Sequence, residues 1–555
     1  MKILGISCFY HDSAACLVIN GEIVTAAEEE RFTREKHDNS YPENAISFCL
    51  EEAGIKAEEL DKIVFYEKPI QKFVRIMETS LHEFPKGYNL FSQAMPEWLG
   101  KKLRFKKRVK KHINFKGDFE FVNHHEAHAA SAFYPSPFDK AAILTIDGVG
   151  ERSTNCMFKG KEDEIKPIKH ITFPDSIGLL YSTITAYLGF MVNNGEFKVM
   201  GLAPYGEPRY REEFREFIDI YEDGSYKLDQ SYFGYTYSKK MWSRKLVELL
   251  GEPRKKDEEL TQRHKDISAT VQDLLEEILL KQTKNLYKLT DTENLCISGG
   301  VGLNSAANGR LKRESQFKNI WIQPAAGDAG GALGAALERS PEKKEMKHAY
   351  YGPKYSENEI ETVLENNELQ YQKISREELP DNVARRLKMG KVISLFQGRM
   401  EWGPRALGNR SIIADPRSAE MKDKINKKVK FRENFRPFAP SVLEEYAQEY
   451  FDIDREDDSP YMLFVYKVKK DKRSEIPAVT HINNTSRIQT VENSSNSLYY
   501  EIIDSFRSLT GTPVILNTSF NLKGMPIVNT PDEAVKCFKN SGIDSLVIGK
   551  YLVDK

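Results

Sequence analysis

The sequence lacks the features that would place the protein in a membrane or build it on disulfide bridges. No apolar run reaches the length that a membrane-spanning helix requires. Its six cysteines, at positions 8, 16, 49, 156, 296 and 537, are scattered and form no CxxC motif. That spacing argues against a zinc ribbon or a disulfide framework and fits a reducing compartment. We therefore expect a cytoplasmic protein that does not associate with membranes.

An excess of either charge is also missing. The 81 basic and 82 acidic residues leave a formal net charge of −1, so no overall charge attracts the chain to nucleic acid. The one strong basic run, residues 101–116 (KKLRFKKRVKKHINFK), has no accompanying pattern of aromatic residues for base stacking. We interpret it as a solvated helix face, with nucleic-acid contact as the alternative. A nucleic-acid partner is not expected, and the oligomeric state is not indicated.

The length of 555 residues predicts two or more domains, because one hydrophobic core does not grow that large. The N-terminal stretch MKILGISCFYHDSAACLVING has polar residues at positions 11 and 12 and no basic leader, so it predicts a strand instead of a signal peptide. In residues 3–30 and again in residues 141–171, a strand, a polar turn and further strands follow one another. Asn20-Gly21 is a strong hairpin turn in the first of these. The repetition predicts a duplicated α/β fold with a nucleotide between its halves.

Four side chains of the first half suit a metal ion. His124 and His128 are four residues apart in HHEAHAASAF, so on a helix their imidazoles share one face. Asp147 ends a predicted strand before a Gly-rich turn, and Asp328 lies in the small-residue loop PAAGDAGGALGAAL. Two imidazoles and two carboxylates suit iron, manganese or zinc. For an HxxxH pair alone the alternative is ordinary packing, and the absence of HExxH argues against a zincin protease.

The second half begins after a segment, residues 341–358, whose Pro, Gly and mixed charges predict a linker. Beyond it, cations and hydroxyls gather at the ends of predicted apolar strands. Guanidinium groups match phosphate geometry bidentately, so these clusters predict a pocket for a ligand with several anionic oxygens. The clusters contain Arg399, Arg405, Asn409, Arg410, Lys430, Arg432, Arg436, Arg487, Asn517, Thr518, Ser519 and Asn521.

The order of motifs resembles a known family. GISCFYHDSAACLV, HHEAHAASAF, IDGVGE, GEFKVMGLAPYG, SGGVGLN and GDAGGALGAA resemble the ASKHA-type domain of tRNA threonylcarbamoyl-transfer enzymes and, more closely, the NodU/CmcH carbamoyltransferases. GPRALGNRSI, FRENFRPFAPSV and LNTSFN resemble the YrdC-like domain of the same carbamoyltransferases. The resemblance implies a duplicated ASKHA (actin-like ATPase) α/β domain over residues 1–340, a linker, and a YrdC-like α/β domain over residues 359–555.

The resemblance also implies site residues. His124, His128, Asp147 and Asp328 would hold a metal, Fe(II) or another divalent transition metal, that contacts nucleotide phosphates. Lys198, Gly300 and Asn304 would lie near the nucleotide, although Lys198 reads equally well as a surface lysine. In the second domain, the residues that would bind carbamoyl phosphate and ATP are Arg405, Lys430, Arg436, Arg487 and Ser519.

The implied activity is ATP-dependent O-carbamoyl transfer. Carbamoyl phosphate and Mg²⁺-ATP would give carbamoyl adenylate in the C-terminal domain, and the carbamoyl group would pass to a hydroxyl of a small acceptor in the N-terminal domain. His11 suits the general base, because an unperturbed imidazole has a pKa of about 6.5, and Asp12 would orient it. The alternative for His11 is a structural turn residue.

Three other functions compete. A hydrogenase-maturation carbamoyl transfer protein of the HypF type should begin with an acylphosphatase domain and zinc-finger CxxC motifs, and this chain has neither. A tRNA threonylcarbamoyl-type enzyme would use threonine and bicarbonate and normally divides its two domains between proteins. A non-catalytic ASKHA ATP-binding protein would need no cationic pocket beyond residue 390. The sequence identifies no acceptor.

Overall fold

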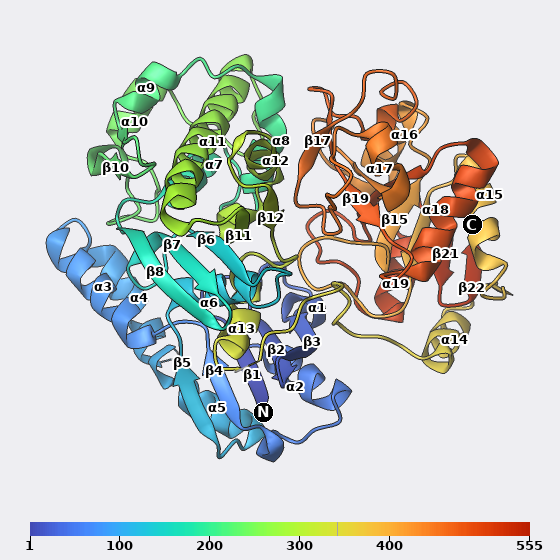
Figure 1. Cartoon of the computed structure of the whole chain (residues 1–555), viewed down its shortest axis with the longest axis horizontal. Helices are drawn as coiled ribbons and strands as arrows, with labels where there is room; N and C mark the ends of the chain where they lie inside the picture. Colours follow the sequence, from blue (N-terminus) through green and yellow to red (C-terminus); the bar gives the residue numbers. More distant parts are fainter. Residues whose placement is uncertain (101, 341) are drawn as a thin grey trace. The chain divides into compact units, whose positions relative to one another are not determined.

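The computed structural model describes residues 1–100, 102–340 and 342–555 (Figure 1). The chain divides into two compact units. Unit 1 comprises Met1–Glu29 and His37–Met346, and unit 2 comprises Glu30–Lys36 and Lys347–Lys555. Lys101 of the basic run and Pro341, where the predicted linker begins, lie outside the described residues. The domain limits predicted from the sequence stay predictions.

Unit 1 contains two five-stranded sheets with the same strand order and the same strand directions. Each has an antiparallel meander of three strands, and two further strands continue parallel to the first strand of the meander. The orders are β3-β2-β1-β4-β5 and β8-β7-β6-β11-β12. The predicted duplication of an α/β pattern is confirmed at this level. The strands are β1 (Lys2–Ser7), β2 (Ala14–Ile19), β3 (Glu22–Glu28), β4 (Lys62–Phe65), β5 (Asp118–Phe121), β6 (Lys140–Ile146), β7 (Ser153–Lys161), β8 (Glu164–Thr172), β11 (Asn294–Ser298) and β12 (Asn319–Trp321).

The hairpin between β2 and β3 shows how local sequence sets this topology. Asn20 and Gly21 have φ angles of 49° and 78°, the left-handed conformation that a two-residue hairpin turn requires. Asparagine and glycine tolerate that conformation best, so the predicted turn is confirmed. A smaller two-stranded sheet pairs β9 (Ile218–Ile220) with β10 (Tyr226–Leu228).

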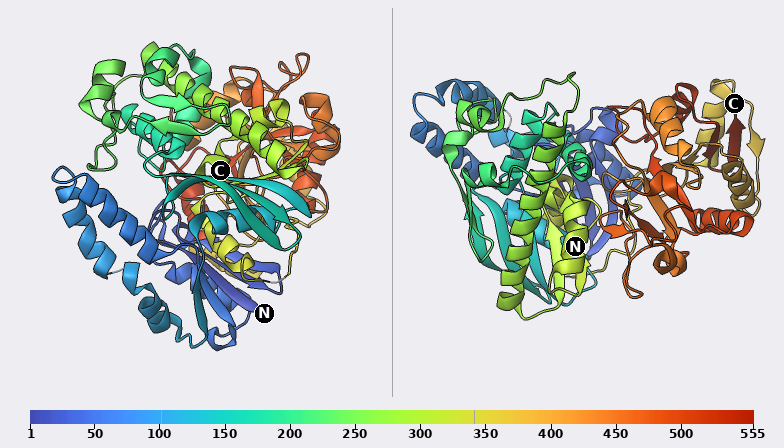
Figure 2. Two further views of the ribbon diagram at one scale, coloured as in Figure 1. Left: turned by 60° about the vertical axis from the view of Figure 1, so that its left-hand side comes forward. Right: turned by 90° about the horizontal axis from the view of Figure 1, so that it is seen from above.

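Helices α6 (His124–Phe133) and α13 (Asp328–Leu337) pack closely together in unit 1. Their contact depends on small residues, because a Cβ atom added at Gly334 would overlap the carbonyl oxygen of Ala127. The long helix α11 (Gln262–Thr290) contacts α7 and α12 in the upper part of this unit (Figure 2). The remaining α-helices are α2 (Glu43–Glu52), α3 (Pro69–His82), α4 (Tyr88–Gly100), α5 (Phe105–Ile113), α7 (Ile177–Tyr187), α8 (Glu196–Leu202), α9 (Arg211–Arg215), α10 (Arg244–Leu250) and α12 (Ser305–Glu314).

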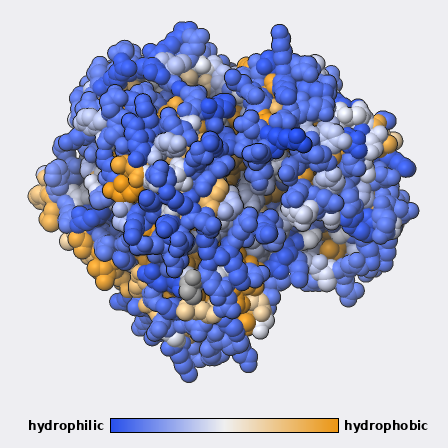
Figure 3. Space-filling model, in the orientation of Figure 1, coloured by the Kyte–Doolittle hydropathy of each residue, from blue (hydrophilic) through white to orange (hydrophobic). Residues whose placement is uncertain are grey.

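The surface of unit 1 differs between neighbouring helices. Figure 3 shows apolar residues along the edge where Figure 1 draws α3 and α4, and Ile70 and Leu81 there are more than 70% exposed. Helix α5 buries Phe105 and Val109, whereas its lysines face solvent, as predicted for a solvated helix face. No helix among the described residues combines the length and apolarity that crossing a bilayer requires.

Unit 2 is built on one eight-stranded sheet of order β13-β22-β21-β14-β15-β20-β16-β19. Its core packs α15 and α18 against the central strands. The strands are β13 (Gln372–Lys373), β14 (Ile393–Phe396), β15 (Arg410–Ala414), β16 (Ala439–Leu443), β19 (Gln489–Val491), β20 (Val514–Ser519), β21 (Ser545–Ile548) and β22 (Tyr551–Asp554), and a separate ribbon pairs β17 (Val465–Lys467) with β18 (Thr485–Arg487).

The helices of unit 2 begin where the sequence supplies caps. Thr530 accepts a hydrogen bond from the Glu533 backbone N–H, and Pro531 takes the first helical position, where its missing N–H costs nothing. A short turn from the N-terminal part of the chain, α1 (Glu30–Thr33), also belongs to this unit. The other helices are α14 (Glu357–Asn366), α15 (Leu379–Lys388), α16 (Glu420–Ile425), α17 (Glu444–Tyr450), α18 (Ser497–Thr510) and α19 (Pro531–Lys539).

Candidate functional site

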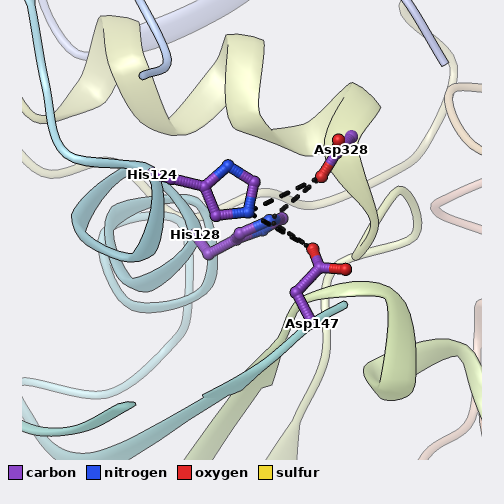
Figure 4. Close-up of side chains that lie close together, drawn as sticks. All are labelled: His124, His128, Asp147 and Asp328. Atoms are coloured by element: carbon purple, nitrogen blue, oxygen red, sulfur yellow. Dashed lines mark hydrogen bonds and ion pairs between the residues drawn. The ribbon is translucent and has the colours of Figure 1, made fainter. Parts of the chain in front are cut away.

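Four buried side chains from three parts of unit 1 point to one place (Figure 4). His124 and His128 lie on successive turns of α6, Asp147 follows the last residue of β6, and Asp328 is the first residue of α13. His128 Nε2 lies 3.1 Å from Asp147 Oδ2 and 3.4 Å from Asp328 Oδ1. His124 Nε2 lies 3.4 Å and 3.8 Å from the same two oxygens. The structure thus brings the four predicted ligands together.

This group can hold a metal ion. Donor atoms about 2.1 Å from one ion lie about 3.0 Å apart at right angles and about 3.4 Å apart in a tetrahedron. Three of the separations just given lie in this range, and the fourth, between His124 Nε2 and Asp328 Oδ1, is longer at 3.8 Å. Two of the atoms, His128 Nε2 and Asp328 Oδ1, are buried without a hydrogen-bond partner in the part of the chain that the structure describes. Buried polar atoms are seldom left this way unless an ion or water completes them. The donor set of two imidazoles and two carboxylates therefore fits a divalent transition metal.

The surroundings orient the four ligands. His128 Nδ1 lies 3.2 Å from Ser298 Oγ, at the end of β11, which leaves Nε2 directed at the carboxylates. The backbone N–H of His124 donates to both carboxylate oxygens of Glu151, at 3.0 and 3.1 Å, and this fixes the start of α6. Partners of this kind hold a metal-binding imidazole in one tautomer and one orientation.

The electrostatics of the group are those of a closely coupled cluster. Burial lowers the pKa of His128, but Asp147 and Asp328 outweigh it and raise that pKa to about 9. Burial raises the pKa of Asp147, but the close approach and the charge of the two histidines hold it well below its usual range. In the structure as it stands, a protonated imidazole therefore balances the carboxylate.

The third histidine of the HHEAH motif has a different role. His125 Nδ1 lies 2.7 Å from Thr145 Oγ1, and its Nε2 lies 2.9 Å from the Ser153 carbonyl oxygen. Burial, with the neighbouring histidines, lowers its pKa to about 3, so it stays neutral. It is a packed residue of the α6–β6 contact and not a member of the ligand group.

The predicted acid–base pair lies beside the ligand group. His11 Nδ1 lies 2.9 Å from Asp12 Oδ2, and His11 Nε2 lies 3.8 Å from Asp328 Oδ2. Asp12 also accepts from His37 Nδ1, at 2.7 Å, and so lies between two imidazoles. Burial lowers the pKa of His11, but the charge of Asp328 and the bond to Asp12 raise it to about 10. A cation that shares Asp328 would oppose this rise.

The three residues predicted near a nucleotide are placed differently. A Cβ atom added at Gly300 would come within 3.3 Å of Asp147 Oδ1, so this glycine borders the ligand group. Asn304 caps α12 by accepting from the Ala307 N–H and exchanges two hydrogen bonds with Gln272, so its amide already has protein partners. Lys198 lies on α8 with its ammonium 5.4 Å from the centre of the Phe190 ring.

Unit 2 contains a cluster of half-buried cations, which we call the cationic cluster: Arg405, Arg432, Arg436 and Arg487. Burial is the main cause that lowers the pKa of each guanidinium, and their mutual repulsion adds to it at Arg405, Arg432 and Arg487. The pKa falls to about 9 for Arg432 and about 10 for Arg405. The Nε atoms of Arg405 and Arg487 are buried without hydrogen-bond partners among the described residues. Four guanidinium groups held this close together, with the Glu433 carboxylate 3.8 Å from Arg436, can bind an anion.

Lys430 and Ser519, two further predicted residues, are in direct contact. The Lys430 ammonium donates to four oxygens of Ser519 and Asn521, at 2.5 to 3.2 Å. Burial, with the charge of Arg432, holds the pKa of Lys430 well below its usual range. Lys430 ends a π-helical turn, Asn426–Lys430, a local irregularity that occurs often at functional sites.

Two of the arginines named in the sequence analysis are structural. Arg410 donates to the carbonyl oxygens of four residues and stacks 3.7 Å from the centre of the Phe396 ring. Arg399 donates to the Tyr351 carbonyl oxygen. The loop between them is held by Glu401, whose Oε1 accepts from three backbone N–H groups at 2.8 to 3.0 Å. Arg432, which belongs to the predicted anion pocket but is not among the ligands that the family resemblance implies, joins the cationic cluster.

These features define a class of protein: two α/β units, one with a buried group that can hold a metal and one with a buried cationic cluster. Comparison with known families agrees with that class and sharpens it. The family description "Carbamoyltransferase N-terminus" matches residues 2–337, and "Carbamoyltransferase C-terminus" matches residues 384–555. The chain belongs to the carbamoyltransferase family, and the predictions of a carbamoyltransferase and of NodU/CmcH kinship are confirmed.

Relatives cover almost the whole chain. An uncharacterized protein of Synechocystis sp. is 47% identical, over 100% of this chain and 96% of its own length. Nodulation protein NolNO of Sinorhizobium fredii is 40% identical, over 99% of this chain and 79% of its own length. Among solved structures, full-length HypF in a phosphate- and nucleotide-bound form has a TM-score of 0.35 at 14% identity, covering 61% of this chain and 55% of that one. A likeness that weak carries no argument.

Proposed function

We propose that the protein is an ATP-dependent O-carbamoyltransferase that works in two steps. In unit 2, water cleaves carbamoyl phosphate to phosphate and carbamate, and an oxygen of the carbamate attacks the α-phosphorus of ATP, which gives carbamoyl adenylate and pyrophosphate. In unit 1, the carbamoyl group passes to a hydroxyl of a small acceptor, and AMP is released. The cationic cluster carries this proposal, because an ATP-binding protein without a second anionic substrate has no need of it.

The residues of the cationic cluster suit the first step. Both substrates are polyanions, and charge spreads over the phosphoryl group during its transfer. Arg405, Arg436 and Arg487 are desolvated, so their interaction with a bound phosphate is stronger than it would be in water. Lys430 and Ser519 lie together as a hydroxyl–ammonium pair. Mg²⁺ bound to ATP would share the neutralisation of the triphosphate.

The residues of unit 1 suit the second step. His124, His128, Asp147 and Asp328 would hold Fe(II) or another divalent metal, which when bound supplies a positive centre for the adenylate phosphate. Asp12 accepts at His11 Nδ1, which leaves Nε2 as the basic atom of the neutral imidazole. We assign His11 the general-base role toward the acceptor hydroxyl. Gly300 leaves room beside Asp147 for the nucleotide, and Lys198 is the proposed further contact.

The products test the proposal. Enzyme, Mg²⁺, ATP and carbamoyl phosphate are incubated with and without a pool of small alcohols, and the nucleotides and phosphates are separated. We expect AMP, pyrophosphate and phosphate, with little AMP from ATP alone, because the α-phosphorus is attacked only when carbamoyl phosphate is present. A kinase or chaperone would attack the γ-phosphate and yield ADP. If ADP is the main product and its amount does not depend on carbamoyl phosphate, the proposal is refuted.

A further inference from the structure

A segment from the N-terminal part of the chain is built into unit 2. Residues Glu30–Lys36, which we call the strap, follow β3 and include the single turn of α1. Arg31 is 2% exposed and donates from Nη2 to the Gly403 carbonyl oxygen at 2.9 Å. Its Nη1 lies 2.8 Å from Glu30 Oε1. A buried guanidinium with a carboxylate neighbour thus binds one specific backbone carbonyl of unit 2.

A second arginine fixes the strap elsewhere. Arg34 donates to the carbonyl oxygens of Ile527, at 2.7 Å, and Pro526, at 2.9 Å. Its guanidinium also lies 3.1 Å from Glu533 Oε2, on α19. Arg31 and Arg34 therefore attach the same strap to two different segments of unit 2.

The carbonyl bound by Arg31 belongs to the loop that leads into Arg405 of the cationic cluster. Gly403 has a φ of 102°, which only glycine adopts readily, and it is followed by Pro404 and Arg405. On one side of it, the Trp402 N–H donates to the Ala349 carbonyl oxygen. On the other side, the next attachment is at Leu407, whose backbone N–H donates to the Glu401 carboxylate. The contact from Arg31 falls between these two attachments, two residues before a guanidinium of the cationic cluster.

The charge at the far end of the strap acts on Lys430. The pKa of Lys430 is lowered by burial first and then by neighbouring cations, among which is Lys36.

We propose that Arg31 is a positioning residue for the carbamoyl phosphate site: by holding the Gly403 carbonyl it fixes the backbone that aims Arg405. Paired hydrogen bonds from a guanidinium to a phosphate depend on a planar geometry that small displacements spoil. Loss of the Arg31 contact should then weaken substrate binding without removing any group that touches the substrate. The inference rests on the function proposed above for unit 2.

Arg31→Ala and Arg34→Ala form a matched pair, since each removes one arginine of the strap, but of the hydrogen bonds described above only that of Arg31 ends on the segment 401–407 that carries Arg405. In the carbamoyl-phosphate-dependent formation of AMP and pyrophosphate, we expect Arg31→Ala to raise KM for carbamoyl phosphate about tenfold with a smaller change in kcat. Arg34→Ala should change KM less than about twofold, although it lowers the melting temperature. Arg31→Lys keeps one donor and should give an intermediate KM.

Equal KM values for carbamoyl phosphate in the two alanine variants would overturn the positioning role and leave only a structural strap. If Arg31→Ala does not fold, Arg31→Lys decides: a wild-type KM overturns the proposal, and a raised KM in a protein of wild-type melting temperature supports it. Failure of the proposed function is a separate result, because the wild-type enzyme would then form no AMP in response to carbamoyl phosphate.

Discussion

At the scale of single residues, the two units bury groups of opposite charge: carboxylates in unit 1 and guanidinium groups in unit 2. In unit 1, Asp147 and Asp328 lie against two imidazoles, and two buried atoms of the group, His128 Nε2 and Asp328 Oδ1, lack hydrogen-bond partners among the described residues. In unit 2, arginines crowd together and depress one another's pKa. A bound cation would stabilise the first arrangement and a bound anion the second, because two carboxylates are buried close together in the first and several guanidinium groups in the second. Side-chain substitutions therefore separate the two sites.

Replacing His128 by alanine should reduce metal affinity by more than about 100-fold. Loss of a residue that only hydrogen-bonds to a metal ligand already lowers metal affinity about 10- to 100-fold, and His128 is expected to bind the metal directly. The matched control is His125→Ala on the same helix, which removes an imidazole bonded to Thr145 and Ser153. The control should destabilise the protein but keep its metal. Elemental analysis of both purified variants makes the comparison, and equal metal content in the two would remove His128 from the ligand set.

His481 should make unit 2 sensitive to acid. Burial, with the charge of Arg487, lowers the pKa of His481 to about 4. A base whose pKa is lower in the folded state binds its proton first in the unfolded chain, so stability is lost as pH falls from about 6.5 toward 4. At pH 5 the loss reaches about 2 kcal/mol. Urea unfolding at pH 7 and pH 5 should show a smaller difference for His481→Gln than for the wild-type protein; an unchanged difference would contradict the assignment.

At the scale of elements, the sequence predicted what depends on local pattern. The spacing of His124 and His128 required only a helix, and Asn20-Gly21 only a hairpin. Asp328 lies 181 residues beyond Asp147, and no local pattern joins them; the family resemblance supplied that link. The sequence could not show that the Asn304 amide is hydrogen-bonded to Gln272, or that Arg410 binds backbone carbonyls, because both contacts depend on tertiary packing. Nor does a four-residue turn such as α1 indicate which unit it joins.

The close contact of α6 and α13 should control the metal group, because these two helices carry three of its four ligands. Gly334→Ala places a methyl group against the Ala127 carbonyl and forces the helices apart. Overpacking of this kind costs about 1–3 kcal/mol or more, and the displacement should lower metal affinity as well. Gly100→Ala, on α4, meets nothing within 4 Å and serves as the control. Chemical unfolding and metal titration test both variants; a Gly334→Ala protein with wild-type affinity would show that the helices tolerate the change.

At the scale of the whole molecule, the two units divide the proposed chemistry. Arg487→Ala should abolish carbamoyl adenylate formation, because it removes a desolvated cation from the anion site. Transfer from supplied carbamoyl adenylate should persist, since that step is assigned to unit 1. His128→Ala should show the reverse pattern. Arg376→Ala, which removes an exposed arginine paired with Glu501, is the control for charge alone. Adenylate formation is followed by pyrophosphate release and transfer from supplied adenylate by AMP release; loss of both steps in Arg487→Ala would argue for one shared active site.

The strap has a consequence for how the chain is made. Arg31 and Arg34 leave the ribosome early, but their carbonyl partners lie 372 to 493 residues further along. At ordinary rates of synthesis, these arginines wait roughly 20–100 s before the rest of unit 2 emerges. Unit 2 therefore cannot finish folding as a late, independent module, because it includes a piece of backbone synthesised at least 372 residues earlier than the carbonyls that it contacts. A gene divided between the two units would separate the strap from the fold that it completes.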